Sequence, residues 1–142
     1  MKTVRTLITI CLVFTAVTLF AQTENRRLMT GKIPFSFWVQ DHFLPAGEYS
    51  IYTVLPERMI RITSTDGRRS AIVTTVPSYS SSVSEKSRLI FHRYGDEYFL
   101  ALVWTGGQTV GRNPISSKRA MDRANNGSPL QTWTVLAEAN HR

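Results

Sequence analysis

Cysteine is almost absent from this sequence, which contains only Cys11. This residue lies in an N-terminal segment that we expect to be removed. The mature chain would then have no thiol chemistry, no disulfide and no cysteine metal site. A chain of 142 residues is long enough to form one domain with a core of its own. Its stability must therefore come from apolar packing and backbone pairing.

Catalytic and metal-binding patterns are also missing. The three histidines, His42, His92 and His141, have neither the spacing of metal ligands nor a nucleophile placed beside them by a known motif. The serines form no Gly-x-Ser-x-Gly elbow. The glycines of residues 105–111 lack a phosphate-binding signature. We therefore predict no catalytic residue, no metal site and no cofactor.

Acidic residues are few: the chain has ten of them against 17 lysines and arginines, and its formal net charge is +7. A basic balance favours anionic partners such as acidic polysaccharide or anionic lipid. Nucleic-acid-binding proteins usually combine a dense basic patch with a recognisable motif. Neither feature is present here, so we expect no nucleic-acid partner.

Residues 1–21 have the layout of a secretory signal peptide. Lys2 and Arg5 precede an uncharged, largely apolar run over 6–20, and Ala21 is a small residue at the expected cleavage position. The apolar run of about 15 residues is shorter than the roughly 20 that span a bilayer as a helix, which argues against an uncleaved anchor. We therefore predict an exported protein, periplasmic or extracellular, with no membrane span in the mature chain.

Apolar residues alternate with polar ones along much of the mature chain, as they do in half-buried strands. We expect a flexible leader over residues 22–32 and a first strand over 33–39. The last strand is expected over 131–137, before a tail at 138–142. Residues 33–137 would then form a single β domain.

Two hairpins are predicted from turn residues that lie between alternating runs. Asp66-Gly67 is a strong hairpin signal because both loop residues of such a tight turn need a positive φ. The resulting register opposes Ile60 to Val73. A second hairpin around Gly95-Asp96 places His92 on a strand with apolar residues on both faces. We expect that strand to be central in the sheet.

A short helix is predicted near the C-terminus. Asn113-Pro114 can cap and begin it, since proline is tolerated at the first helical position, and the helix would end near Ala124. Its apolar side is thin, which is typical of a surface helix. The complete pattern predicts an all-β fold: an antiparallel β-sandwich or a small open barrel of six or seven strands with one short C-terminal helix.

Three stretches of the sequence together resemble a known family. They are Ile33-Pro-Phe-Ser-Phe-Trp-Val with Leu44-Pro-Ala-Gly-Glu-Tyr, then Leu89-Ile-Phe-His-Arg-Tyr-Gly-Asp-Glu-Tyr-Phe-Leu, and the segment from Val103-Trp-Thr to Gly111-Arg-Asn-Pro. Over roughly residues 30–125 the chain is similar to a family of small exported bacterial proteins of uncharacterised function. The resemblance implies export and an all-β mature domain, and it implies no activity, cofactor or catalytic residue.

Two sets of side chains are candidates for binding. The aromatic set could stack on sugars or contact an apolar partner, although aromatic rings in small β domains mostly fill the core. It consists of Trp38, Tyr52, Tyr79, Trp104 and Trp133, of which Trp38 and Trp104 are the predicted binding residues. The basic set lies around the predicted helix and could meet the phosphate groups of a lipid or polysaccharide. Its alternative role is that of solvated cations near a helix C-terminus. The basic set consists of Arg112, Lys118, Arg119 and Arg123.

These observations predict a non-catalytic secreted or envelope-associated module that binds a protein, a polysaccharide or a lipid surface. One alternative is a small hydrolase-like enzyme with a site assembled from loops. A cleft that holds His42 or His92 within hydrogen-bond reach of a carboxylate would favour that alternative. The other alternative is a structural protein that self-assembles through an exposed edge strand.

Overall fold

Ten strands and one short helix make up the described part of the chain, residues 25–54 and 58–140 of the computed structural model. The predicted all-β class is therefore confirmed. The predicted signal peptide at 1–21, the turn residues Pro56-Glu57 and the C-terminal His141 lie outside the described residues. The described helix is too short and too polar to cross a membrane.

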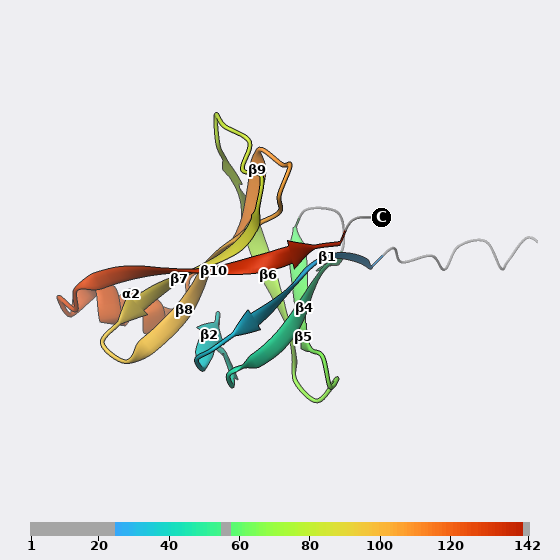
Figure 1. The fold of residues 1–142 in the computed structure, drawn as a ribbon. Coiled ribbons are helices and arrows are strands. Elements are labelled where there is room, and N and C mark those ends of the chain that lie inside the picture. Colours follow the sequence, from blue (N-terminus) through green and yellow to red (C-terminus); the bar gives the residue numbers. More distant parts are fainter. Residues whose placement is uncertain (1–24, 55–57, 141–142) are drawn as a thin grey trace, which may run out of the picture.

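The strands differ in length, from the three residues of β2 to the ten of β6, and tight turns connect several of them (Figure 1). In chain order the elements are β1 (Arg26–Ile33), β2 (Phe37–Val39), β3 (His42–Leu44), β4 (Gly47–Val54), β5 (Met59–Ser64), β6 (Ser70–Tyr79), β7 (Ser87–Tyr94), β8 (Glu97–Trp104), β9 (Val110–Pro114), α2 (Lys118–Asn125) and β10 (Leu130–Ala139).

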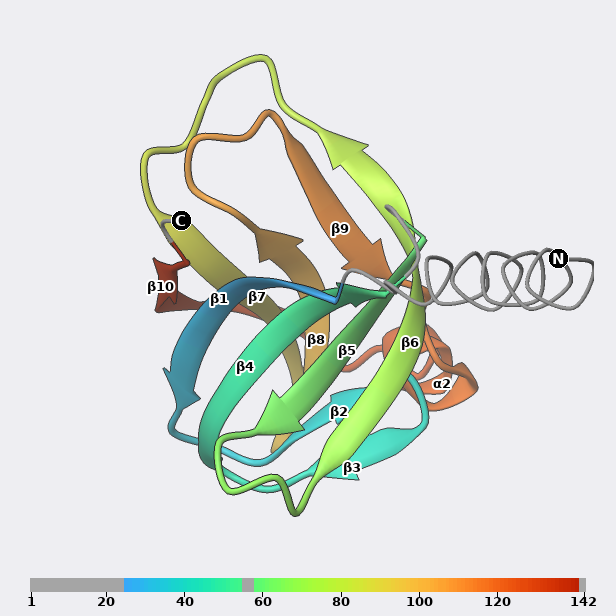
Figure 2. The same ribbon diagram turned by 90° about the vertical axis from the view of Figure 1, so that its right-hand side faces the viewer.

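Eight of these strands close into an antiparallel barrel. Neighbours follow the order β8-β7-β10-β1-β4-β5-β6-β9, and β9 returns to β8 through the pair Val103 and Arg112. Figure 2 shows β1, β4, β5 and β6 on the near side of the ring. The β2–β3 hairpin lies beside the ring, where Trp38 pairs in parallel with Phe99. The prediction of a sandwich or an open barrel of six or seven strands is therefore wrong.

The two strands that complete the ring are those that the sequence pattern missed. Residues 26–32 belong to β1 and not to a flexible leader, and this strand pairs with both β4 and β10. Its alternation is broken by a bulge between Arg27 and Met29. The other missed strand is β9, which is only five residues long. The strand β10 also extends to Ala139, into the segment predicted as a tail.

Side chains that point into the barrel fill it. The ring of Phe37 meets the rings of Phe91 and Tyr49 edge to face, with both centroid distances at 5.4 Å. Full burial of each large apolar side chain stabilises the fold by about 1.5–3 kcal/mol. The fully buried side chains are Met29, Ile33, Phe37, Val39, Tyr49, Ile51, Ile60, Ile62, Val73, Leu89, Phe91 and Val103.

The predicted register of the first hairpin is confirmed, since Ile60 opposes Val73. That of the second is confirmed near its turn, where His92 opposes Phe99. A bulge between Ile90 and Phe91 shifts the rest by one residue, so that Leu89 opposes Val103 and not Leu102.

One turn also differs from the prediction. In the first turn only Gly67 has a positive φ, at 73°. The expected tight turn with two positive φ values is therefore wrong, and the reversal runs through a longer loop. A backbone hydrogen bond from the Ser64 N–H to the Arg69 carbonyl, at 2.8 Å, closes that loop.

The helix begins later than predicted. Asn113 and Pro114 are the last residues of β9, where they pair with β6. The helix α2 is capped instead by Ser117, whose hydroxyl accepts a hydrogen bond from the Ala120 backbone N–H at 3.1 Å. Serine is a strong capping residue because its side-chain oxygen reaches an otherwise unpaired N–H of the first turn.

Candidate functional site

Helix α2 is attached to the barrel by three side chains that the sequence marked for binding. The guanidinium of Arg119 lies 4.5 Å from the ring centroid of Trp38. The same guanidinium donates to Oε1 of Glu97 at 2.6 and 2.7 Å. Arg123 donates to Oε2 of that carboxylate at 2.5 Å. Trp38, Arg119 and Arg123, together with Glu97, therefore hold the helix in place. The neighbouring Lys118 is exposed.

The pKa of Glu97 reflects this arrangement. Burial alone raises it, but the hydrogen bonds and charges of Arg119 and Arg123 outweigh burial and leave the pKa below its ordinary value of 4.5. Because the pKa is lower in the folded state, the contact stabilises at neutral pH and is lost as the pH falls through the lowered value. Both arginines are about half exposed, so the pair contributes little, of the order of 0–1 kcal/mol.

Substitution of Glu97 should loosen α2 without unfolding the barrel. We expect Glu97→Gln to speed amide hydrogen exchange in residues 117–126 several-fold and to leave exchange in β7 unchanged, because no residue of the helix is buried. Exchange measured by mass spectrometry tests this, with Glu48→Gln on the exposed side of β4 as the matched control. Unchanged exchange in the helix would show that Glu97 does not hold it.

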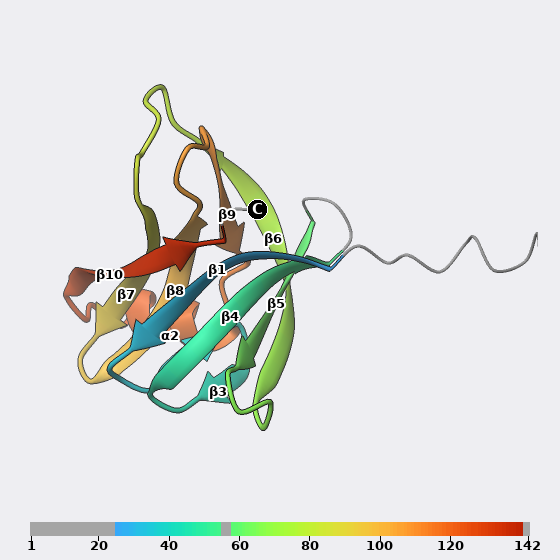
Figure 3. The same cartoon turned by 45° about the vertical axis from the view of Figure 1, so that its right-hand side comes forward.

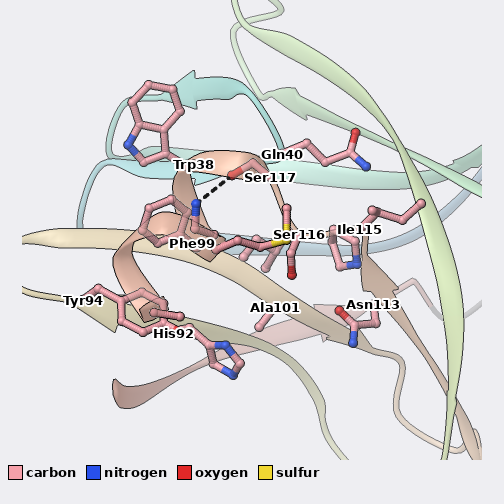
Figure 4. A pocket seen from close by; sticks show the side chains of 15 residues that line it. Trp38, Gln40, His92, Tyr94, Phe99, Ala101, Asn113, Ile115, Ser116 and Ser117 are labelled. Carbon is pink, nitrogen blue, oxygen red and sulfur yellow. Dashed lines mark hydrogen bonds between the residues drawn. The ribbon is translucent and has the colours of Figure 1, made fainter. Parts of the chain in front are cut away.

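A pocket of about 160 Å³ lies between α2 and the outer face of β7 and β8 (Figure 4). Its lining includes Trp38, His92 and Phe99. Burial lowers the pKa of His92 and so favours the neutral form of its ring. None of the described residues that line this pocket is acidic, and His42 lies outside it on β3. The pairing of a histidine with a carboxylate that would favour an enzyme is therefore not formed in this pocket.

Trp104 fills the space between β8 and β9. It is 3 % exposed, and the guanidinium of Arg88 lies 5.8 Å from its ring centroid. Gly111 makes this packing possible, since a Cβ at that position would be 2.5 Å from the indole. A ring enclosed in this way cannot stack on an external sugar. Trp104 is therefore a core residue and not a binding residue.

Arg112 lies apart from the helix, in a cleft of about 590 Å³ at one end of the barrel. We call this cleft the barrel mouth; Figure 3 shows β6 and β9 side by side at that end of the barrel. The two strands pair there, with Pro77 opposite Arg112 and Tyr79 opposite Val110. The residues lining the barrel mouth are Arg58, Thr74, Thr75, Val76, Pro77, Tyr79, Gln108, Val110, Gly111 and Arg112.

The barrel mouth combines positive charge with polar and aromatic groups. None of its ten described lining residues is acidic. Tyr79 is 78 % exposed, and Arg58 and Gln108 are exposed as well. Arg112 also interacts elsewhere within the chain. Clefts of about 300–1,000 Å³ commonly hold small ligands, and the mouths of barrels are among their usual places.

The two candidate sets contain two members of this cleft, Arg112 and Tyr79, but they do not predict that the two lie together. They also lack Arg58 and Gln108. Arg112 was grouped with the helix because the two are close in sequence, whereas pairing of β6 with β9 places it beside Tyr79. Arg58 and Gln108 lie in turns and carry no local signal. Only the closure of the barrel brings these segments together.

Among residues 25–54 and 58–140, no group of three histidine, cysteine or acidic side chains lies close enough together to hold a metal ion. The resemblance to exported bacterial proteins stays a prediction from the residues. No protein-family model matches this sequence, and no curated protein or solved structure is significantly similar to it.

Proposed function

We propose that this protein is an exported, non-catalytic module that binds a segment of acidic polysaccharide in the barrel mouth. One observation carries the proposal: Arg58 and Arg112 line a cleft of about 590 Å³ that has no acidic side chain among its described lining and an exposed tyrosine ring at its rim. A ligand that fits such a cleft carries negative charge and offers a surface for an aromatic ring.

Acidic sugars meet both requirements. Guanidinium groups form paired, charge-assisted hydrogen bonds with carboxylates, which makes arginine well suited to uronic acid residues. The ring of Tyr79 can pack against the C–H groups of a pyranose, and the amide of Gln108 can bond to its hydroxyl groups. An anionic lipid fits less well, because Val76, Pro77 and Val110 provide only a small apolar area for an acyl chain.

The described structure favours this proposal over the two alternatives. The described lining of the pocket that contains His92 includes no carboxylate that could pair with the histidine, so it does not favour an acid–base site. Self-assembly through a strand edge needs a free edge, and barrel closure removes most of them. The terminal strand of the described sheet is β3, which has three residues.

Binding of oligogalacturonate by the mature chain tests the proposal, with neutral maltohexaose as the comparison sugar. We expect calorimetry at low salt to detect binding of oligogalacturonate that excess maltohexaose does not displace. Arg112→Gln should weaken this binding about tenfold or more, since a hydrogen bond between charged groups contributes about 1.5–3 kcal/mol. Tyr79→Ala should weaken binding as well.

Arg68→Gln is the matched control, because it removes the same charge from an exposed turn away from the barrel mouth. An equal loss in this variant would indicate attraction by net charge alone. Absence of any binding to the acidic sugar would contradict the proposal.

A further inference from the structure

A second surface with the features of a binding site surrounds Trp133 on β10. Trp133 is 44 % exposed, whereas Trp104 is buried and Trp38 is half-buried. It lies toward the other end of the barrel from the mouth: its neighbour Tyr98 is near the start of β8, and Val103, which pairs with Arg112, is near the end. Exposure of a single apolar residue is normal, so the surroundings of the ring decide its significance.

The indole of Trp133 is held in a fixed orientation. Its ring meets those of Phe35 and Tyr98 edge to face, at centroid distances of 6.4 and 6.0 Å. Those two rings stack on each other at 3.8 Å, and Phe35 also contacts the buried ring of Phe91. The exposed part of the indole is therefore a rigid surface backed by the core, which reduces the entropy lost when a ligand packs on it.

Planar polar groups lie beside this ring. Gln131 is two residues before Trp133 on β10, so the two side chains share one face of the strand. Gln131 pairs with Arg93 across the sheet and accepts a hydrogen bond from it at 3.4 Å. Arg93 also donates to the Gly95 carbonyl at 2.7 Å and lies 3.5 Å from the carboxylate of Asp96.

The charge of Arg93 is thus engaged within the chain. Its guanidinium contacts an amide, a carbonyl and a carboxylate, and it lies 5.4 Å from the ring centroid of Tyr98. The carboxylate of Asp96 is fully exposed beside it. The cation of this surface is therefore already engaged with neighbouring groups, which disfavours an acidic ligand. A neutral ligand fits it better.

We infer that Trp133, Gln131, Arg93 and Asp96 form a second binding site, which we call the Trp133 platform, for a neutral hexopyranose of a glycan chain. One face of a pyranose presents C–H groups that pack on an indole ring. The equatorial hydroxyl groups lie near the plane of the sugar, where the Gln131 amide and the Asp96 carboxylate can form hydrogen bonds with them. The inference is independent of the barrel mouth, because the two surfaces share no residue.

Indole N–H signals in NMR spectra of the mature chain test the inference. The probes are cellohexaose, maltohexaose and chitohexaose, each titrated to millimolar concentration. We expect at least one of them to shift the Trp133 signal saturably and to leave the Trp38 and Trp104 signals in place. Trp133→Phe identifies the signal and keeps an aromatic ring in the cluster, so the barrel stays folded.

Gln131→Ala is the decisive variant, since an exposed strand residue can be changed without disturbing the core. We expect it to weaken binding about fivefold or more and to leave the melting temperature unchanged. Arg112→Gln should bind the neutral sugar as the wild type does.

Two results would overturn the inference. One is that none of the three sugars shifts the Trp133 signal, which would show that the indole only covers the end of the barrel. The other is that Gln131→Ala binds as tightly as the wild type. A shift produced by a protein from envelope extract, with none from the sugars, would assign this surface to a protein partner and would also contradict the inference.

Discussion

Replacement of Phe37 by alanine is expected to destabilise the barrel by about 3–5 kcal/mol, the usual cost of removing a buried aromatic ring. Phe37 comes from β2, a strand of three residues beside the ring of eight, yet its side chain is fully buried. It contacts Phe91 and Tyr49 edge to face. The variant would leave a cavity that these neighbours fill only in part. Since small domains are stable by about 5–15 kcal/mol, much of the total would be lost.

Urea unfolding followed by circular dichroism measures this loss. Phe43→Ala is the matched control, because Phe43 lies in the same hairpin on β3 and is 54 % exposed. We expect this control to cost less than about 1 kcal/mol, as surface substitutions usually do. Equal losses in the two variants would show that the β2–β3 hairpin contributes to stability as a surface unit and not by placing a ring in the core.

Gly111→Ala is expected to lower the stability by about 1–3 kcal/mol, because a methyl group has no room there. A Cβ would lie 2.5 and 2.8 Å from two atoms of the Trp104 ring and 3.0 Å from a methyl group of Leu102. Trp104 is buried and cannot turn away without moving β9. Gly111 also lines the barrel mouth, so the shift should displace Arg112 and weaken binding of the acidic sugar.

Thermal unfolding tests the effect on stability, and the melting temperature should fall by about 4–20 °C. Gly47→Ala serves as the control, since a Cβ there would meet only Tyr49, at an ordinary contact distance of 3.6 Å. A second substitution, Trp104→Leu, should return part of the stability in the Gly111→Ala background, because the smaller side chain relieves the clash. Loss without any such recovery would show that the contact with Trp104 is not the cause.

Residue type and location in the chain identified the candidate side chains but not their roles. Trp38, Arg119 and Arg123 are the kinds of residue that bind ligands, and the structure brings all three together. The sequence contains no indication that Glu97 faces the two arginines, because the carboxylate is more than 20 residues away from both. The two arginines hold the helix because both bind Glu97, and Arg119 also lies against the ring of Trp38.

Exposure of the aromatic side chains was equally difficult to predict. Trp104 and Trp133 both lie on strands with mixed alternation, and only one of them is buried. Trp104 is enclosed because Gly111 on a neighbouring strand has no side chain to keep that strand at a distance. Trp133 is 44 % exposed because it lies on β10 near an end of the barrel, where the rings of Phe35 and Tyr98 meet one side of its indole.

Local patterns were sufficient for the all-β class, for the register of the first hairpin and for the part of the second hairpin nearest its turn. Alternation of apolar side chains and turn residues act between neighbours in the chain, so a pair such as Ile60 and Val73 can be assigned from the sequence. Closure of the barrel was decided by the tertiary structure alone. It depends on pairing between β1 and β10, as at Met29 and Ala139, and between β8 and β9. Such pairs form through backbone hydrogen bonds, which every residue type except proline can supply, and so they leave no pattern in the sequence.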